Sequence, residues 1–136
     1  ESEIIPDVEF RVIESSEEYD NKIAVVKAHK LLLSGVSEVF RKQFYGPMKE
    51  EKKVIDILET TIEAFTTMIN FFYSKENFSM SNIQDTAVLF EVLNIANRYM
   101  ATGLIDTVEN AIKNLDLSLD NVMLFAATLD VQAKQG

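Results

Sequence analysis

The sequence predicts an α+β domain, because strands come first and helices follow with one further strand among them. Residues 7–12 alternate polar and apolar side chains, as a half-buried strand does. Residues 23–28 form a short apolar run that is typical of a second strand. From His29 onward, apolar side chains recur about once per helical turn. A strict alternation of strands and helices is missing, which argues against an α/β fold.

The first half of the chain is predicted to hold a hairpin, a helix and a third strand. The polar, acidic residues 14–21 separate the first two strands and favour a turn between them. One helix is expected to start at His29 and end near Gly46-Pro47. Its apolar positions are Leu32, Leu33, Val36, Phe40 and Phe44. After the charged residues 49–53, residues 54–58 read as the third strand.

The second half is predicted to be helical. Thr60 or Thr61 can cap a helix that carries Glu63 in its first turn. Its apolar stripe is Ile62, Phe65, Met68, Ile69 and Phe72. A polar connector spans 77–82, and a helix is expected over 83–100, ending near Gly103. That helix carries Leu89, Leu93, Ala96 and Met100 on one side. A further helix is expected over 104–115, and Ser118 is expected to cap a last one.

The composition of the chain limits the classes of function that it can have. The 136 residues suffice for one domain, and the net charge of −9 comes from 22 acids against 13 bases. Such a surface disfavours nucleic acid and anionic membranes as partners, because both attract lysine and arginine. No apolar run approaches the length that spans a bilayer. The absence of cysteine fits a reducing compartment, the cytoplasm or the nucleus. The chain starts at Glu1, so we expect it to be an excerpt of a longer protein.

No set of residues typical of an enzyme is visible, and no cofactor or metal is expected. One histidine without cysteine leaves no Cys-His pair, and the four glycines form no phosphate-binding loop. His29 could act as a ligand or as a pH switch. The alternative is a buried structural histidine whose nitrogens bond to backbone at the joint between strand and helix. The second interpretation is favoured.

Four motifs in order resemble the BTB/POZ domain, a protein-interaction module. They are Asp7-Val8-x-Phe10-x-Val12, Ala28-His29-Lys30-x-Leu32-Leu33-Ser34-x-x-Ser37-x-x-Phe40, residues 54–58, and Phe65-x-x-Met68-Ile69-x-Phe71-Phe72-Tyr73. The resemblance implies a short mixed sheet flanked by about five helices. Phe40, Phe65, Phe72 and Leu93 are expected in one core. Residues 1–116 would be the BTB/POZ domain. Residues 117–136 look like the start of a three-box or BACK helical extension, as in BTB-BACK proteins.

The resemblance also implies two interaction sites. In members that bind transcriptional partners, the positions of Asp7 and Lys30 line a charged pocket, although a buried ion pair is their commoner role. A symmetric homodimer would use Ile4, Ile5, Val8 and Leu32. Many BTB dimers place a helix before the first strand, and here only residues 1–6 precede Asp7.

Met48-Lys49-Glu50 resembles the hydrophobic-x-Glu motif with which many BTB adaptors bind a cullin. Met48 would be the anchor and Glu50 the hydrogen-bond acceptor, with Phe44, Tyr45 and Tyr99 as the neighbouring wall. The favoured function is therefore a self-associating substrate adaptor of a cullin-RING ubiquitin ligase of the cullin three type. The substrate would be captured by regions outside this chain. The alternative is an oligomerisation or corepressor-recruiting module of a transcription regulator or channel-associated protein, without cullin binding.

Overall fold

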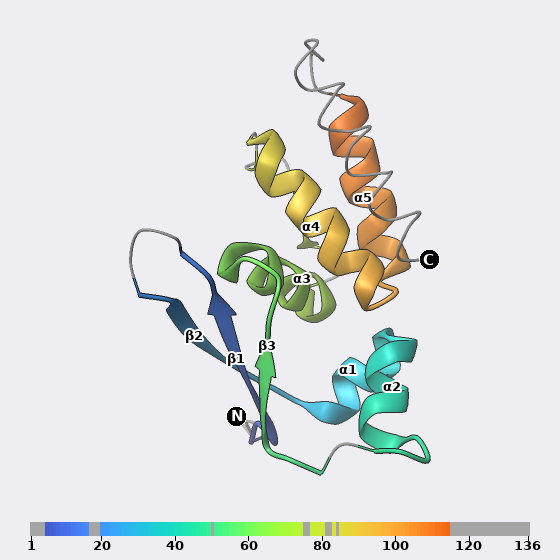
Figure 1. Ribbon diagram of the computed structural model, residues 1–136. Helices are drawn as coiled ribbons and strands as arrows, with labels where there is room; N and C mark the ends of the chain where they lie inside the picture. The colour runs from blue at the N-terminus through green and yellow to red at the C-terminus, as the bar shows by residue number, and fades with distance from the viewer. Residues whose placement is uncertain are drawn as a thin grey trace.

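The computed structural model describes residues 5–16, 20–49, 51–74, 77–80, 83 and 85–114. The described residues form three strands and five helices, as Figure 1 shows. Ile4 and Glu50 lie outside these ranges, and so does all of the predicted extension over 117–136 with its cap at Ser118.

The sheet is short and mixed. β1 (Val8–Glu14) pairs antiparallel with β2 (Lys22–Ala28), which confirms the predicted hairpin. β3 (Val54–Ile57) pairs parallel with β1 on its other side, giving the strand order β2-β1-β3. Val8, Phe10 and Val12 of β1 face the core, because side chains alternate along a strand, and Ile13 is half-buried. The expectation of an α+β fold is confirmed.

Five helices cover one side and one end of this sheet (Figure 1). α3 (Ile62–Ser74) contacts β1 and also α4 (Thr86–Arg98), which in turn packs along α5 (Thr102–Lys113). The Thr61 hydroxyl accepts a hydrogen bond from the Ala64 N–H and so caps α3, as the sequence suggested. α1 (Lys30–Val36) and α2 (Glu38–Tyr45) form a separate pair.

The single helix expected from His29 to Gly46 is wrong. It is broken at Ser37, whose backbone is extended with φ −138° and ψ 119°. The Ser37 hydroxyl accepts a hydrogen bond from the Phe40 N–H at 3.2 Å and starts a second helix. The apolar spacing continues across the break because Leu33, Phe40 and Phe44 all reach the same core.

The predicted helix end at Gly103 is also wrong. α4 ends at Arg98, and the chain turns at Met100, which adopts φ 54°. Met100 is exposed and does not extend the apolar side of α4. Gly103 lies inside α5 instead. A Cβ atom there would lie 2.9 Å from the Phe71 ring, so the glycine permits a close approach of two helices.

A cluster of aromatic side chains forms the centre of the core. The ring of Phe10 lies 5.6 Å from that of Phe40 and 5.2 Å from that of Phe65, centre to centre. Phe40 also stacks on Tyr99 at 4.4 Å. The four residues expected in one core, Phe40, Phe65, Phe72 and Leu93, are all buried in the hydrophobic core around these rings. The predicted core is therefore confirmed.

Candidate protein-interaction surfaces

The joint between β2 and α1 is held by the hydroxyl of Tyr73. The His29 backbone N–H donates to this hydroxyl at 2.9 Å, and the His29 Nδ1 lies 2.6 Å from it. His29 is half-buried, and its ring nitrogen bonds to a side chain. The expectation of a buried histidine whose nitrogens bond to backbone is therefore wrong for Nδ1, which bonds to the Tyr73 side chain. The contact supports a structural role, since it ties the last turn of α3 to the start of α1.

The hydroxyl of Tyr73 should make a measurable contribution to stability. Replacing Tyr73 with phenylalanine removes the acceptor of the His29 N–H and the partner of its ring nitrogen. A hydrogen bond of this kind contributes about 1 kcal/mol, so the free energy of unfolding should fall by about that amount. Urea unfolding measures it. Tyr45→Phe is the control, because Tyr45 is exposed and its change should stay within about 0.5 kcal/mol. An equal loss in both variants would contradict the assignment.

Asp7 and Lys30 do come together, but through the backbone of Lys30. The Lys30 N–H donates to the Asp7 Oδ1 at 2.8 Å, so one of the N–H groups at the start of α1 that has no partner within the helix is hydrogen-bonded. The Lys30 ammonium lies 5.5 Å from the centre of the Phe44 ring, a cation–π distance. Asp7 is exposed and Lys30 half-buried, so this is not the buried ion pair that was expected as the commoner role.

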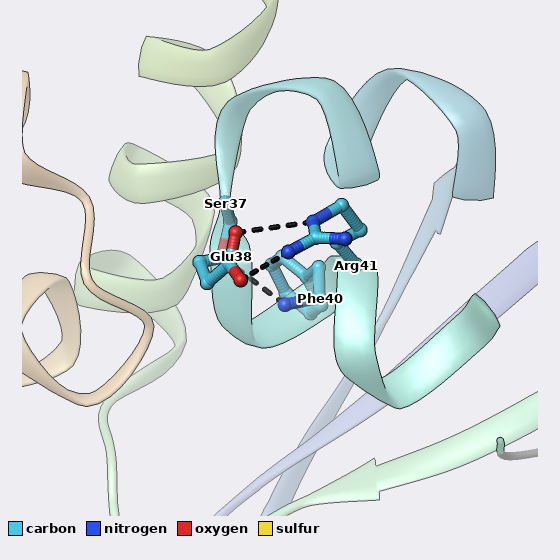
Figure 2. A network of polar contacts seen from close by, with 4 residues as sticks. All are labelled: Ser37, Glu38, Phe40 and Arg41. Carbon is cyan, nitrogen blue, oxygen red and sulfur yellow. Dashed lines mark hydrogen bonds and ion pairs between the residues drawn. The ribbon is translucent and has the colours of Figure 1, made fainter. Parts of the chain in front are cut away.

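Ser37 connects the start of α2 to the turn between α4 and α5. Its hydroxyl donates to the Tyr99 carbonyl at 2.7 Å while it accepts from the Phe40 N–H. Beside it, Arg41 is paired with Glu38 on the surface, as Figure 2 shows. Ser37 is the only polar residue in the described ranges that is buried. Sequence reasoning missed this role, although a serine followed by an acidic first turn is a capping signal.

The turn after α2 presents an apolar side chain to solvent. Met48 is 92% exposed, and Tyr45 at the end of α2 is 55% exposed. Phe44 and Tyr99, expected beside them, are buried in the core at 3% and 7% exposure. They therefore support this surface from behind and do not line it. Glu50, the expected acceptor, lies outside the described residues.

Burial raises the pKa of the Tyr99 phenol above its usual value of 10.0, and the nearby Arg98 opposes the rise. Burial is also the main cause that raises the pKa of Tyr73. The folded protein then holds these protons more tightly than the unfolded chain. The free energy of unfolding is therefore expected to fall as pH rises above about 10. Urea unfolding at a series of alkaline pH values checks this, and Tyr99→Phe should fall less steeply than the wild type. Equal slopes would contradict it.

The expected dimer contact is only partly available on this surface. Leu32 on α1 is exposed, and its neighbour Leu31 is 76% exposed. Ile5 is exposed as well. Val8 is 2% exposed because it faces the core from β1, so it cannot contact a second copy in this fold. Ile4 lies outside the described residues. Leu31, which the sequence analysis did not single out, joins Leu32 on the outer side of α1.

The part of the chain described here shows no group of three or more histidine or acidic side chains that could bind a metal ion. Within the same ranges, every helix is too short or too polar to span a lipid bilayer. Exposed apolar side chains lie on and after α1 and α2, at Leu31, Leu32, Tyr45 and Met48, and also on β2, at Ile23 and Val25. Where such side chains form a contiguous patch, the surface is typical of one that binds other proteins.

Comparison with known proteins gives the family. The model of the BTB/POZ domain family matches residues 7–115, so the chain belongs to the BTB/POZ family. It is a protein–protein interaction domain. The chain is 31% identical over 118 residues to BTB/POZ domain-containing protein 9 of Drosophila melanogaster, covering 87% of this chain and 15% of that protein. It is 30% identical over 110 residues to TD and POZ domain-containing protein 3 of Mus musculus, covering 79% of this chain and 29% of that protein.

A solved structure shares the fold. The BTB domain of zebrafish PATZ1 superposes with a TM-score of 0.60 at 20% identity, covering 81% of this chain and 77% of that one. The described chain thus has the BTB fold, as the resemblance implied. Because the chain spans less than a third of the two relatives above, the partners of the whole protein remain a matter for proposal.

Proposed function

We propose that this domain is a substrate adaptor that binds the N-terminal region of a cullin of the cullin three type. The observation that carries the proposal is the 92% exposure of Met48 in the turn that follows α2. An unbranched apolar side chain in that position is costly to leave in water and easy to fit into a pocket. Transfer of such a side chain out of water stabilises a complex by about 1.5–3 kcal/mol.

The rest of the surface supports the same role. Tyr45 stands exposed one turn before Met48, where it can flank the partner. Phe44 and Tyr99 pack with Phe40 and hold α2 against the core, which keeps the turn in a fixed place. Glu50 is proposed as the acceptor that orients the partner. A rigid support of this kind lowers the entropy lost on binding.

The lengths of the relatives fit an adaptor with a second functional region. The chain spans 15% and 29% of the two relatives above, and the name of a third, BTB/POZ and MATH domain-containing protein 3 of Arabidopsis thaliana, includes a MATH domain. We propose that residues 117–136 begin a BACK or three-box extension and that a substrate binds still further along the full protein. Action in the cytoplasm or nucleus belongs to the same proposal.

Calorimetry of this domain against the N-terminal region of the cullin tests the proposal. We expect a 1:1 complex per domain with a measurable heat. If the wild type gives neither heat nor a complex on gel filtration, the adaptor function fails. The second candidate function would then take its place.

The second candidate is a homo-oligomerisation or corepressor-recruiting module. The observation that favours it is the exposed pair Leu31 and Leu32 on α1, with Ile5 also exposed. In a symmetric dimer, each copy would offer this patch to the other. Asp7 and Lys30, joined at the start of α1, would be the charged pocket for a transcriptional partner.

Sedimentation measures the self-association directly. We expect a dimer at tens of micromolar concentration for the wild type and a shift toward monomer for Leu31→Asp/Leu32→Asp, because burying a charge in an apolar contact is unfavourable. Val8 is left unchanged because it belongs to the core. A clean monomer in the wild type at this concentration would refute self-association of this chain.

A further inference from the structure

Charge is distributed unevenly along this acidic chain. Residues 38–53 hold five lysines or arginines against three glutamates. The remainder of the chain holds eight bases against nineteen acids. The segment that carries the proposed cullin anchor is thus net basic, as residues 22–30 with three lysines and no acid also are, in a protein whose net charge is −9.

Two of these bases lie next to the exposed apolar side chains. Lys42 lies in the last turn of α2, and its carbonyl accepts the N–H of Gly46, where the chain turns away from the helix. Lys49 follows Met48 directly, and both lysines are exposed. Lys42 therefore precedes Tyr45 by about one helical turn, and Lys49 adjoins Met48 in the chain.

The remaining bases of the segment have acidic neighbours. Arg41 is paired with Glu38 at the start of α2. Lys53 lines a hollow together with Asp7 and Glu9. Lys52 lines another hollow with Arg11 and Asp56, which pair with each other. Lys42 and Lys49 are the bases of the segment that lie nearest to Tyr45 and Met48 in the chain, and Glu50 and Glu51 follow Lys49.

We propose that the partner surface that receives Met48 is acidic, an apolar pocket with aspartate or glutamate carboxylates on its rim, and that Lys42 and Lys49 steer it into place. The inference rests on the proposed binding function of this surface and adds the chemistry of the partner. The net charge of −9 disfavours an acidic partner over most of this chain, and the net basic segment around Met48 makes its approach more favourable there. Complementary potentials of this kind act mainly on the association rate and on orientation.

If Lys42 and Lys49 steer the partner, changing them should alter the association rate constant, and the size of this effect should depend on the salt concentration. Exposed ion pairs contribute little to equilibrium affinity, so single changes at the rim should be nearly silent there. The association rate constant, in contrast, should respond to the local potential at low ionic strength. At high salt the potential is screened within a few ångströms, and the response should disappear.

Stopped-flow association with the cullin N-terminal region tests this with two matched double variants. Lys42→Glu/Lys49→Glu changes the basic rim of the anchor. Lys22→Glu/Lys113→Glu makes the same change in net charge elsewhere, at exposed lysines of β2 and of the last turn of α5. Lys42 and Lys113 both occupy the last turn of a helix, so the effect on the helix dipole is matched. Thermal unfolding of each variant checks that the domain is still folded. If a lysine-to-glutamate variant is unfolded, the variant with glutamine at the same positions is measured in its place.

In about 25 mM salt, we expect the rim variant to associate about five- to tenfold more slowly than the wild type and the control variant less than about twofold more slowly. In about 300 mM salt, the three rates should converge. Equal slowing in both variants, no slowing in either, or faster association of the rim variant overturns the inference and leaves the adaptor function standing. Absence of any complex with the wild type overturns both.

Discussion

Replacing Met48 with alanine should weaken capture of the cullin N-terminal region by about thirtyfold or more. Truncation of a central interface anchor commonly costs about 2 kcal/mol, and this cost corresponds to a thirtyfold change in affinity. Met48 is 92% exposed in the free domain, so its loss should leave the free energy of unfolding within about 0.5 kcal/mol of the wild type. Calorimetry and urea unfolding on the same samples separate the two effects.

The neighbouring positions supply the controls for this result. Met48→Leu keeps an apolar side chain of similar volume and should retain most of the affinity. Lys49→Ala removes only a rim charge and should be nearly silent at equilibrium. Glu50→Ala, at the proposed acceptor, should weaken binding strongly. If the wild type binds and Met48→Ala binds equally well, the assignment of the anchor is wrong although the adaptor function survives.

Replacing Phe40 with alanine should have the largest effect on stability, a loss of about 3–5 kcal/mol in the free energy of unfolding. Phe40 is fully buried, and its ring contacts those of Phe10, Phe44, Phe72 and Tyr99. Its removal opens a cavity where β1, α2, α3 and the turn after α4 meet. Because small domains are only marginally stable, the variant is expected to be mostly unfolded at 37 °C.

Tyr45 offers the matched control for Phe40 on the same helix. Tyr45→Ala also truncates an aromatic side chain of α2, but this side chain is more than half exposed. Its effect on unfolding should be a small fraction of that of Phe40→Ala. Urea unfolding followed by circular dichroism measures both. Similar losses in the two variants would show that helix propensity, and not the aromatic core, decides the stability of α2.

The fold could be predicted from the sequence wherever a local pattern decides it. Alternation along residues 7–12 predicts β1, and the apolar spacing after residue 60 predicts α3. The break at Ser37 could not be predicted from spacing alone. Leu33 and Phe40 are seven residues apart, the spacing of two turns in a continuous helix, although the break places them on different helices. The Ser37 hydroxyl, by contrast, donates to the carbonyl of Tyr99, far along the chain. Tertiary contacts of this kind leave no periodic signal.

The turn after α4 shows a second limit of prediction from local sequence patterns. Gly103 is a good residue for ending a helix, yet the left-handed residue is Met100. The glycine is required by the Phe71 ring packed against α5, which only the assembled fold reveals. In the candidate site, the exposed position of Met48 followed from its place after a helix. The burial of Phe44 and Tyr99 depended on the aromatic core and was missed.

The strand order β2-β1-β3 also bears on how the protein avoids aggregation. Within the described residues, β2 and β3 each have one edge that no other strand covers, and such edges can pair with strands of other molecules. β2 carries Lys22 and Lys27 near its two ends, and β3 has only four residues, one of them Asp56. Charges on a strand and a short length both disfavour the addition of a foreign strand. Lys22 and Lys27 on β2 and the short length of β3 therefore work against uncontrolled pairing at the sheet edges, although β2 also exposes the apolar side chains of Ile23 and Val25.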